Sequence, residues 1–574
     1  MLVAMIKMIC LHYSTEHGDK YTSPSSTRAT IRKIVQRTIR YLPRVLINTT
    51  TGRLYDRAEQ ASASESLPIF NELVSSMTTR IGYARIKREV RQCFRYVMLS
   101  HKWEDNEPLF QQVVHLAVYD LEPSPTHDKL QTFCRLVRDA GFKWTWSDTC
   151  CINKSDHFVL QEALFAMFKW YQGSAMMIVF LRGVSSSSQR GALARSIWNT
   201  RGWTLQEYVA SKIIHFYTKD WTVYLELQFP NHKEAPEVIL EMEEATGVSA
   251  KQLIALRPGL SSIREKLRLA STRQTTLVED AAHSLLEIFS VTGIPAIYGE
   301  GEGSLGRLLA HVLTGSGDVR ILAWTGDSGS FNSCLPAYIT VFDGPATSHL
   351  PPAITDTEME GIMTMSQSSS FDLDVALKLY ERLNELPAPW FAASRMKLPC
   401  IAISLPPLSR YRSRSGRVYR TETVDFGMVE IKTRYDLTLM KSLYLVHPWL
   451  DTLLEREDKS NMVAEEEALP PSPNTDDEIS DGEISDDASS LAEPELPSHP
   501  APDHMPPIDR GMRARRLVAH LRQPFGALLL TLASTGGRAV DHKRVATDSS
   551  ITVQFQENVS LVDILDNVRT LDVL

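Results

Sequence analysis

A glutamate that follows a tryptophan by four residues marks the place where chemistry is best supported in this chain. Residues 201–207 read Arg-Gly-Trp-Thr-Leu-Gln-Glu, which places Trp203 and Glu207 one helical turn apart on the same face of a helix. A fixed carboxylate beside a sugar stabilises the positive charge that develops when a glycosidic bond breaks. We therefore take Glu207 as the candidate catalytic residue and Trp203 as a candidate substrate contact. An ion pair between Glu207 and Arg201, and a core position for Trp203, are the structural alternatives.

Two upstream segments supply further polar and aromatic candidates. Residues 96–103 read Tyr-Val-Met-Leu-Ser-His-Lys-Trp, and residues 146–154 read Trp-Ser-Asp-Thr-Cys-Cys-Ile-Asn-Lys. Each begins as a strand, and ligands of open parallel sheets bind outside the carboxyl ends of the strands. We therefore expect substrate contacts at that edge from four residues, namely Ser100, His101, Trp103 and Asp148. Each also has a structural explanation, such as packing for Trp103 or backbone hydrogen bonds for Asp148.

The elements that must position these residues alternate between short apolar strands and amphipathic helices. We predict strands at residues 96–100, 142–148, 175–181 and 212–217, and helices at residues 129–140 and 157–171. The segment 197–209, which carries Glu207, stands between the last two strands. This alternation is typical of an α/β fold with a parallel sheet and flanking helices.

The three segments, in this order, resemble the three-block signature of the fungal heterokaryon-incompatibility (HET) domain. Residues 271–276, 279–282, 298–301 and 321–324 resemble the downstream part of HET proteins, so the resemblance covers about residues 45–324. It implies a role in non-self recognition that leads to regulated cell death.

The order of the elements also resembles the Toll/interleukin receptor (TIR) domain, which implies a TIR/flavodoxin-like parallel sheet. TIR domains with enzymatic activity cleave NAD with a glutamate that follows the third strand, and Glu207 matches that position. The resemblance implies NAD as a substrate and no resident cofactor. It leaves two alternatives open. The chain is either an enzyme of the NAD glycohydrolase type or a non-catalytic, self-associating signalling or scaffold module.

Two departures from the HET pattern bear on this choice. Trp103 is followed by Glu104 where the family commonly has glycine, and Lys154 stands where the family commonly has glutamine. The first change removes a flexible residue and adds a charge to the loop, and the second adds a positive charge beside the expected pocket.

Composition limits the class of protein. With 574 residues and 43% hydrophobic content, the chain can form several domains. No apolar run reaches the roughly 20 residues of a membrane-spanning helix. The seven cysteines are scattered without a Cys-x-x-Cys motif, which favours reduced thiols and no metal site. We expect a cytoplasmic protein that self-associates or binds signalling proteins, without a nucleic-acid partner.

Charge and element patterns divide the chain into five parts. We expect a basic, disordered leader at 1–44 with a helix near 29–42, the HET domain with its helical extension at 45–324, and a β-rich domain at 325–454 and 511–574. Between those last two ranges lies an insertion at 455–510, expected to be disordered, with 16 acidic and two basic residues between Glu455 and Asp503. Ser480 and Ser485 in that insertion are candidate phosphorylation sites.

The helical extension is predicted from two apolar segments. Residues 277–289 and 305–313 are expected to be helical. The spacing of Gly301, Gly303 and Gly306 matches a dinucleotide-binding fingerprint, but Glu300 and Glu302 would repel a pyrophosphate. We therefore interpret this stretch as a flexible turn before a helix.

Overall fold

The chain divides into two compact units. The computed structural model describes residues 21–22, 24–65, 68–75, 81–344, 373–413, 416–440, 442–449, 507–533, 540–556 and 558–574. The first unit, called the N-terminal unit here, consists of residues 1–316, 329–331 and 335–345, and the C-terminal unit consists of the remainder. The five-part division expected from the sequence stays a prediction.

A six-stranded sheet forms the centre of the N-terminal unit. Its strands are β2 (Val45–Asn48), β3 (Leu54–Asp56), β5 (Tyr96–His101), β6 (Trp144–Trp146), β7 (Met176–Leu181) and β8 (Ile214–Thr218). Their order is β3-β2-β6-β5-β7-β8. Strands β6, β5, β7 and β8 run parallel, and β2 joins β6 antiparallel. Every residue of β5 and β7 is buried, as expected for strands covered on both faces. The α/β class is confirmed.

Three helices connect the parallel strands. They are α7 (Pro125–Asp139), α8 (His157–Gly173) and α9 (Gly202–Ala210). Helix α7 begins four residues before its predicted start, because the Ser124 hydroxyl accepts a hydrogen bond from the His127 N–H and proline occupies the first helical position. The predicted alternation of strands and helices between residues 96 and 218 is confirmed, with ends that shift by a few residues.

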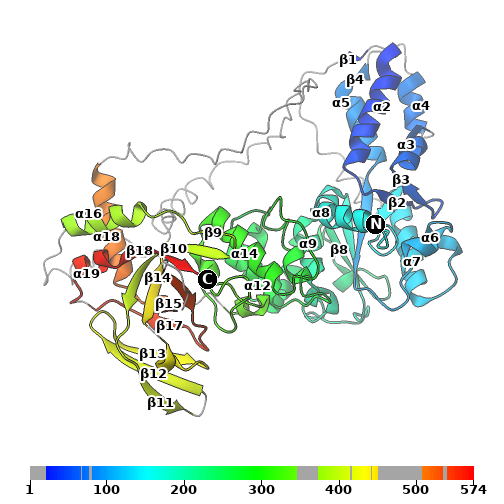
Figure 1. The fold of residues 1–574 in the computed structure, drawn as a ribbon. Helices are drawn as coiled ribbons and strands as arrows, with labels where there is room; N and C mark the ends of the chain where they lie inside the picture. The colour runs from blue at the N-terminus through cyan, green and yellow to red at the C-terminus, as the bar shows by residue number, and fades with distance from the viewer. Residues whose placement is uncertain are drawn as a thin grey trace. The chain divides into compact units, whose positions relative to one another are not determined.

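A helical bundle is formed by one helix that precedes β2 in the chain and three helices that lie between β3 and β5. It contains α2 (Pro24–Arg40), α3 (Arg57–Glu65), α4 (Pro68–Ser75) and α5 (Tyr83–Cys93), and a short pair, β1 (Tyr21–Thr22) with β4 (Ile81–Gly82), lies beside it. Figure 1 shows these helices side by side. Ile31, Ile34, Val35 and Ile39 of α2 are all buried. The helix expected near residues 29–42 is confirmed as α2, so the expected disorder of the leader does not hold for residues 24–44, whereas residues 1–20 and residue 23 lie outside the described residues.

Short helices complete the N-terminal unit. They are α6 (Phe110–Val113), α10 (Pro236–Thr246), α11 (Ala250–Ala255), α12 (Ile263–Ser271), α13 (Asp280–His283) and α14 (Gly303–Ser316). The helix expected at residues 305–313 is confirmed as α14. The helix expected at residues 277–289 is wrong in extent, because only α13 is helical there. Glu279 instead accepts hydrogen bonds from the N–H groups of Gly299 (2.8 Å) and Gly301 (3.0 Å).

The C-terminal unit contains two sheets. In the first, β10 (Arg395–Ser404), β14 (Leu443–Pro448), β15 (Phe525–Leu532), β16 (Asp541–Arg544) and β18 (Val568–Val573) form a closed ring of pairings, joined by β9 (Trp390–Ala392) and β17 (Ile551–Val553). The second contains β11 (Ser409–Ser413), β12 (Gly416–Thr423) and β13 (Gly427–Thr433). Three helices, α16 (Leu373–Asn384), α18 (Pro507–Leu521) and α19 (Leu561–Asp566), belong to the same unit.

The strands on either side of the acidic segment are paired with each other. Strand β14 precedes the segment and β15 follows it, and Leu445 pairs with Leu529 in antiparallel register. The predicted strands near 400–405, 442–446, 525–532 and 551–555 are confirmed. The predicted disorder of residues 455–510, with Ser480 and Ser485, falls almost entirely outside the described residues.

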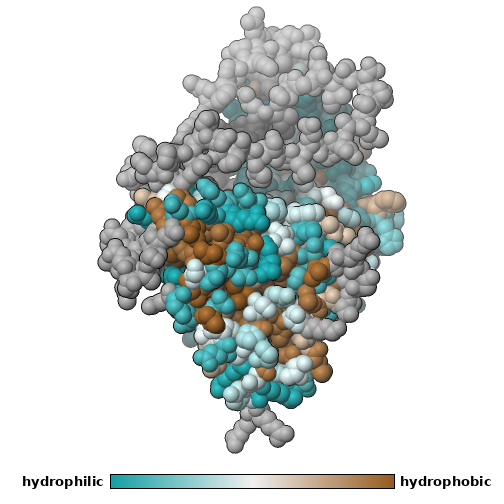
Figure 2. Space-filling view, turned by 60° about the vertical axis from the view of Figure 1, so that its left-hand side comes forward, coloured by the Kyte–Doolittle hydropathy of each residue, from teal (hydrophilic) through white to brown (hydrophobic). Residues whose placement is uncertain are grey.

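The surface carries scattered hydrophobic residues. Val424, Met428 and Leu439 are at least 65% exposed. Figure 2 shows hydrophobic and hydrophilic residues interleaved on one face of the molecule. Among the described residues, no helix combines the length and apolar character needed to cross a membrane.

Candidate functional site

Two of the sequence blocks meet through a buried hydrogen bond. The Ser100 hydroxyl, at the carboxyl end of β5, donates a hydrogen bond to Glu207 Oε2 on α9. The indole N–H of Trp198, from the short 3-10 helix η2 (Ile197–Thr200), donates to Ser100 Oγ at 2.7 Å. Ser100 is 1% exposed and Glu207 is 7% exposed. The Glu207 carboxyl group is therefore buried next to the carboxyl end of β5, where the Ser100 hydroxyl is its hydrogen-bond partner.

The remaining candidates of the first two blocks gather around Asp148. The Trp103 indole N–H donates to Asp148 Oδ2 at 2.7 Å, and His101 Nε2 lies 3.4 Å from Asp148 Oδ1. The His101 contact has an ion-pair distance but not the geometry of a hydrogen bond, since both ring nitrogens lack a hydrogen-bond partner. Lys154 Nζ lies 3.2 Å from the centroid of the Trp103 ring, in a cation–π contact. One face of Trp103 is thus already covered.

The two carboxyl groups have opposite pKa shifts. Burial raises the pKa of Glu207 to about 8, and nearby Asp148 adds to this, although the hydrogen bond from Ser100 opposes it. Burial also acts to raise the pKa of Asp148, but His101, Lys154 and Trp103 outweigh it and hold the pKa below its usual value. At neutral pH, Glu207 is therefore mainly protonated and Asp148 is ionised. Carboxyl groups whose environments separate their pKa values are typical of acid and base pairs.

The loop after β5 is held by ion pairs at the position where the sequence departs from the HET pattern. Glu104 Oε1 lies 3.5 Å from Lys129 Nζ of α7, and Glu104 Oε2 lies 3.2 Å from Arg182 Nε. Lys129 also pairs with Glu107, and both of these side chains are almost fully buried. The charge introduced by Glu104 therefore fastens this loop to the helix and to the segment after β7.

Residues far along the chain position α9. Arg273 donates to Thr204 Oγ1 at 2.8 Å, to Asn199 Oδ1 at 2.9 Å and to the carbonyl oxygen of Arg201 at 3.0 Å. A Cβ atom added at Gly202 would lie 2.4 Å from Thr275 Cγ2. The sequence analysis included residues 271–276 in the family resemblance but missed this positioning role. Trp198 was also missed, because an indole within an irregular segment gives no periodic signal.

Trp203 is the candidate that the structure leaves apart. It is half-buried in the first turn of α9. Within the described part of the chain, no polar or ring contact joins it to the cluster of Ser100, Asp148 and Glu207. The ion pair between Glu207 and Arg201 that was considered as an alternative is likewise not formed among the described residues.

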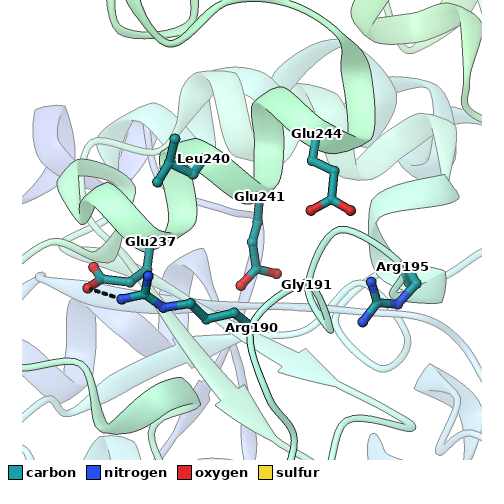
Figure 3. Close-up of a pocket in the computed structure, with 7 residues that line it drawn as sticks. All are labelled: Arg190, Gly191, Arg195, Glu237, Leu240, Glu241 and Glu244. Carbon is teal, nitrogen blue, oxygen red and sulfur yellow. Dashed lines mark hydrogen bonds and ion pairs between the residues drawn. The ribbon is translucent and has the colours of Figure 1, made fainter.

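A separate cavity of about 300 Å³ lies between the loop before η2 and α10. Figure 3 shows its lining, which contains none of the candidate residues: Arg190, Gly191, Arg195, Glu237, Leu240, Glu241 and Glu244. Glu241 accepts from the N–H groups of Leu193 (2.9 Å) and Ala194 (3.1 Å), and from the Tyr224 hydroxyl. These carboxylate contacts hold the loop against α10, so we assign Glu241 a structural role.

No metal site accompanies the cluster among the described residues. Groups of three or more histidine, cysteine, aspartate or glutamate side chains that could hold an ion do not occur in this part of the chain. The described cysteines are free thiols, and those beside Asp148, Cys150 and Cys151, are buried.

Comparison with known proteins finds similarity over part of the chain. A family model described as heterokaryon incompatibility protein (HET) matches residues 96–196, which include Ser100, His101, Trp103 and Asp148 but end before Glu207. The vegetative incompatibility protein HET-E-1 of Podospora anserina is 33% identical over 228 residues, which cover 37% of this chain and 16% of the relative's length. No solved structure gives a significant match. On these matches, the chain carries a heterokaryon-incompatibility (HET) domain of the fungal type.

Proposed function

We propose that this protein is a cytoplasmic heterokaryon-incompatibility effector whose HET domain cleaves NAD, with Glu207 as the catalytic residue. The observation that carries the proposal is the hydrogen bond between Ser100 of the first block and Glu207 of the third, beside the ionised Asp148. It joins residues 107 positions apart at the carboxyl end of β5. That edge is where open parallel sheets bind ligands.

The strand order supports a TIR/flavodoxin-like arrangement. Counted in chain order, the four parallel strands lie in the order second, first, third and fourth. This is the beginning of the flavodoxin-like order, in which ligands bind where the order reverses, beside the first strand. Glu207 lies on the helix that follows the third parallel strand, where the TIR resemblance places the catalytic glutamate.

The reaction needs an ionised carboxylate near the ribose. When water attacks the ribose carbon, nicotinamide leaves with the electron pair of the broken bond, and the added water releases one proton. Because Glu207 is buried and its pKa is raised to about 8, the glutamate must become solvated or meet a cationic substrate before it can stabilise the positive sugar. We therefore propose that activity requires a rearrangement that exposes Glu207, such as one driven by self-association.

The test uses the purified full-length protein, clustered through a multivalent tag, with NAD as the substrate and nicotinamide release as the signal. The matched pair of variants is Glu207→Gln and the exposed Glu244→Gln. We expect Glu207→Gln to lower the release rate by about 100-fold, the scale of losing a transition-state contact, while Glu244→Gln retains it. Circular dichroism establishes that both variants are folded. Absence of release from folded, clustered wild-type protein would contradict NAD cleavage.

A non-catalytic, self-associating module is the second candidate function. It is favoured by the near-complete burial of Glu207 and by the ion pairs that fasten the Glu104 loop. In this case Glu207→Gln would preserve both self-association, measured by sedimentation, and cell death in the fungal host. Loss of cell death with intact self-association would instead favour the enzyme.

A further inference from the structure

The helical bundle presents a concentrated basic surface. Helices α2 and α5 pack against each other, as Figure 1 shows. Together they carry nine lysine and arginine residues and one acidic residue, Glu89. All nine basic side chains are exposed: Arg28, Arg32, Lys33, Arg37, Arg40, Arg85, Lys87, Arg88 and Arg91. The complete chain has a net charge of −8, so this surface is positively charged on a protein that is negatively charged in total.

Acidic neighbours neutralise only part of this charge. Arg85 lies 3.5 Å from Glu72, and Arg88 lies 3.7 Å from Glu89. The arginines of both pairs are exposed to solvent, and the attraction in such surface ion pairs is weak. Among the residues that the structure describes, no ion pair involves Lys33, Arg37 or Arg40. A row of basic side chains on α2 therefore remains available to an external anion.

The apolar side chains of the two helices face inward. Ile31, Ile34, Val35 and Ile39 of α2 and Ile86 and Val90 of α5 are at most 5% exposed. A helix that enters a membrane interface needs an exposed apolar face, and a surface that stacks unpaired bases needs exposed aromatic rings. In the described part of the bundle, Tyr41 is the one large hydrophobic side chain that is strongly exposed, at 73%. Contact with phosphate groups alone fits this surface better.

The distribution of charge around α2 favours a nucleic-acid duplex over a lipid bilayer as the ligand. At 100° per residue, the five basic positions between Arg28 and Arg40 spread over about half of the helix circumference. They extend over roughly 18 Å of helix axis. A planar bilayer surface can contact basic side chains on only one side of such a helix. The two phosphate backbones that line the groove of a duplex can contact basic side chains on opposite sides of it. Seven of the nine basic residues are arginine, whose planar fork suits phosphate oxygens.

We propose that the surface of α2 and α5 binds the phosphate backbone of double-stranded nucleic acid, without reading its sequence. This inference is independent of NAD cleavage at Glu207. The sequence analysis expected no nucleic-acid partner, because the charges of residues 1–44 resembled those of a solvated arm. The folded structure changes this expectation, because α2 packs against α5, and α5 carries four further exposed basic residues more than 40 positions later in the chain.

The experiment measures binding of the full-length protein to a fluorescent 20-base-pair duplex of arbitrary sequence by anisotropy, between 50 and 200 mM salt. The test variant removes three unpaired charges of α2 (Lys33→Gln, Arg37→Gln, Arg40→Gln). The matched control removes three exposed lysines elsewhere in the same unit (Lys169→Gln, Lys219→Gln, Lys251→Gln). Glutamine is a good helix former, so thermal unfolding should report folded protein in both cases.

We expect the wild type and the control variant to bind the duplex with the same steep dependence on salt. The test variant should bind at least about tenfold more weakly at 100 mM salt, and its logarithmic salt slope should fall by about 0.9 for each lost phosphate contact. Equal weakening in the two variants, or no binding by the wild type, would overturn the proposal. Vesicles that contain phosphatidylserine are the third probe. Binding to them that exceeds duplex binding would assign the surface to membranes and also overturn it.

Discussion

At the scale of single residues, the unusual feature is a glutamate that the fold keeps protonated. Burial raises the pKa of Glu207 to about 8, while Asp148 in the same cluster has a lowered pKa. The sequence placed both residues at the same edge of the sheet but could not show which would be ionised. That distinction depends on Trp103, His101 and Lys154 surrounding Asp148, whereas mainly Ser100 contacts Glu207.

The raised pKa of Glu207 predicts a particular dependence of stability on pH. The pKa in an unfolded chain is about 4.3, so between that value and about pH 8 the folded state holds more protons. Stability should therefore fall as pH rises through this window, by at most about 1.4 kcal/mol per pH unit. Glu207→Gln replaces the neutral carboxyl by a group of similar shape and should remove this fall.

Thermal unfolding of the wild type and of Glu207→Gln at pH 6 and pH 9 measures the effect. The wild type should lose more stability than the variant on going to pH 9. Parallel behaviour of the two proteins would show that Glu207 is already ionised at neutral pH.

At the scale of elements, α9 is positioned by a segment about 70 residues later in the chain. Arg273 clamps its first turn, and Thr275 packs where Gly202 has no side chain. We predict that Gly202→Ala destabilises the N-terminal unit by about 1–3 kcal/mol, the usual cost of overpacking. Thr275→Ser removes the methyl group that the new Cβ would meet at 2.4 Å, so the double variant should recover much of the loss. Urea unfolding of the four proteins forms a complete cycle, and purely additive effects would contradict this packing.

Some of the helices and strands could be predicted from the sequence, and others could not. Continuous apolar runs predicted β5 and β7 because burial on both faces leaves a strong local signal. The helix expected at residues 277–289 is limited to α13 (Asp280–His283), and turn-type hydrogen bonds such as Leu286 N–H to His283 O follow it, a difference that the local apolar pattern did not indicate. Within the candidate site, Ser100, His101, Trp103, Asp148 and Glu207 lie at the same edge of the sheet, whereas Trp203 lies apart, and the roles of all six stay predictions. Trp198 and Arg273 required the folded structure to be recognised.

At the scale of the whole molecule, the division into units runs through a short segment that the sequence assigned to the HET extension. Residues 317–328 belong to the C-terminal unit, in which Arg544 is buried among backbone carbonyl groups. Its guanidinium donates to the carbonyl oxygens of Leu322 (2.9 Å) and Trp324 (2.7 Å) and lies 3.7 Å from the centroid of the Trp324 ring. This one side chain therefore ties the segment to β16.

We predict that Arg544→Ala destabilises the C-terminal unit by about 3 kcal/mol, because it leaves buried carbonyl groups without donors and removes the packing on Trp324. Hydrogen exchange followed by mass spectrometry can separate the units. Peptides from β10, β15 and β16 should exchange faster in the variant, while peptides from β5 and β7 keep their wild-type rates. Arg382→Ala, which removes an exposed arginine from the same unit, is the control and should leave both sets unchanged. Faster exchange of β5 in Arg544→Ala would mean that the two units unfold as one, and that the HET domain depends on the β-rich unit for its stability.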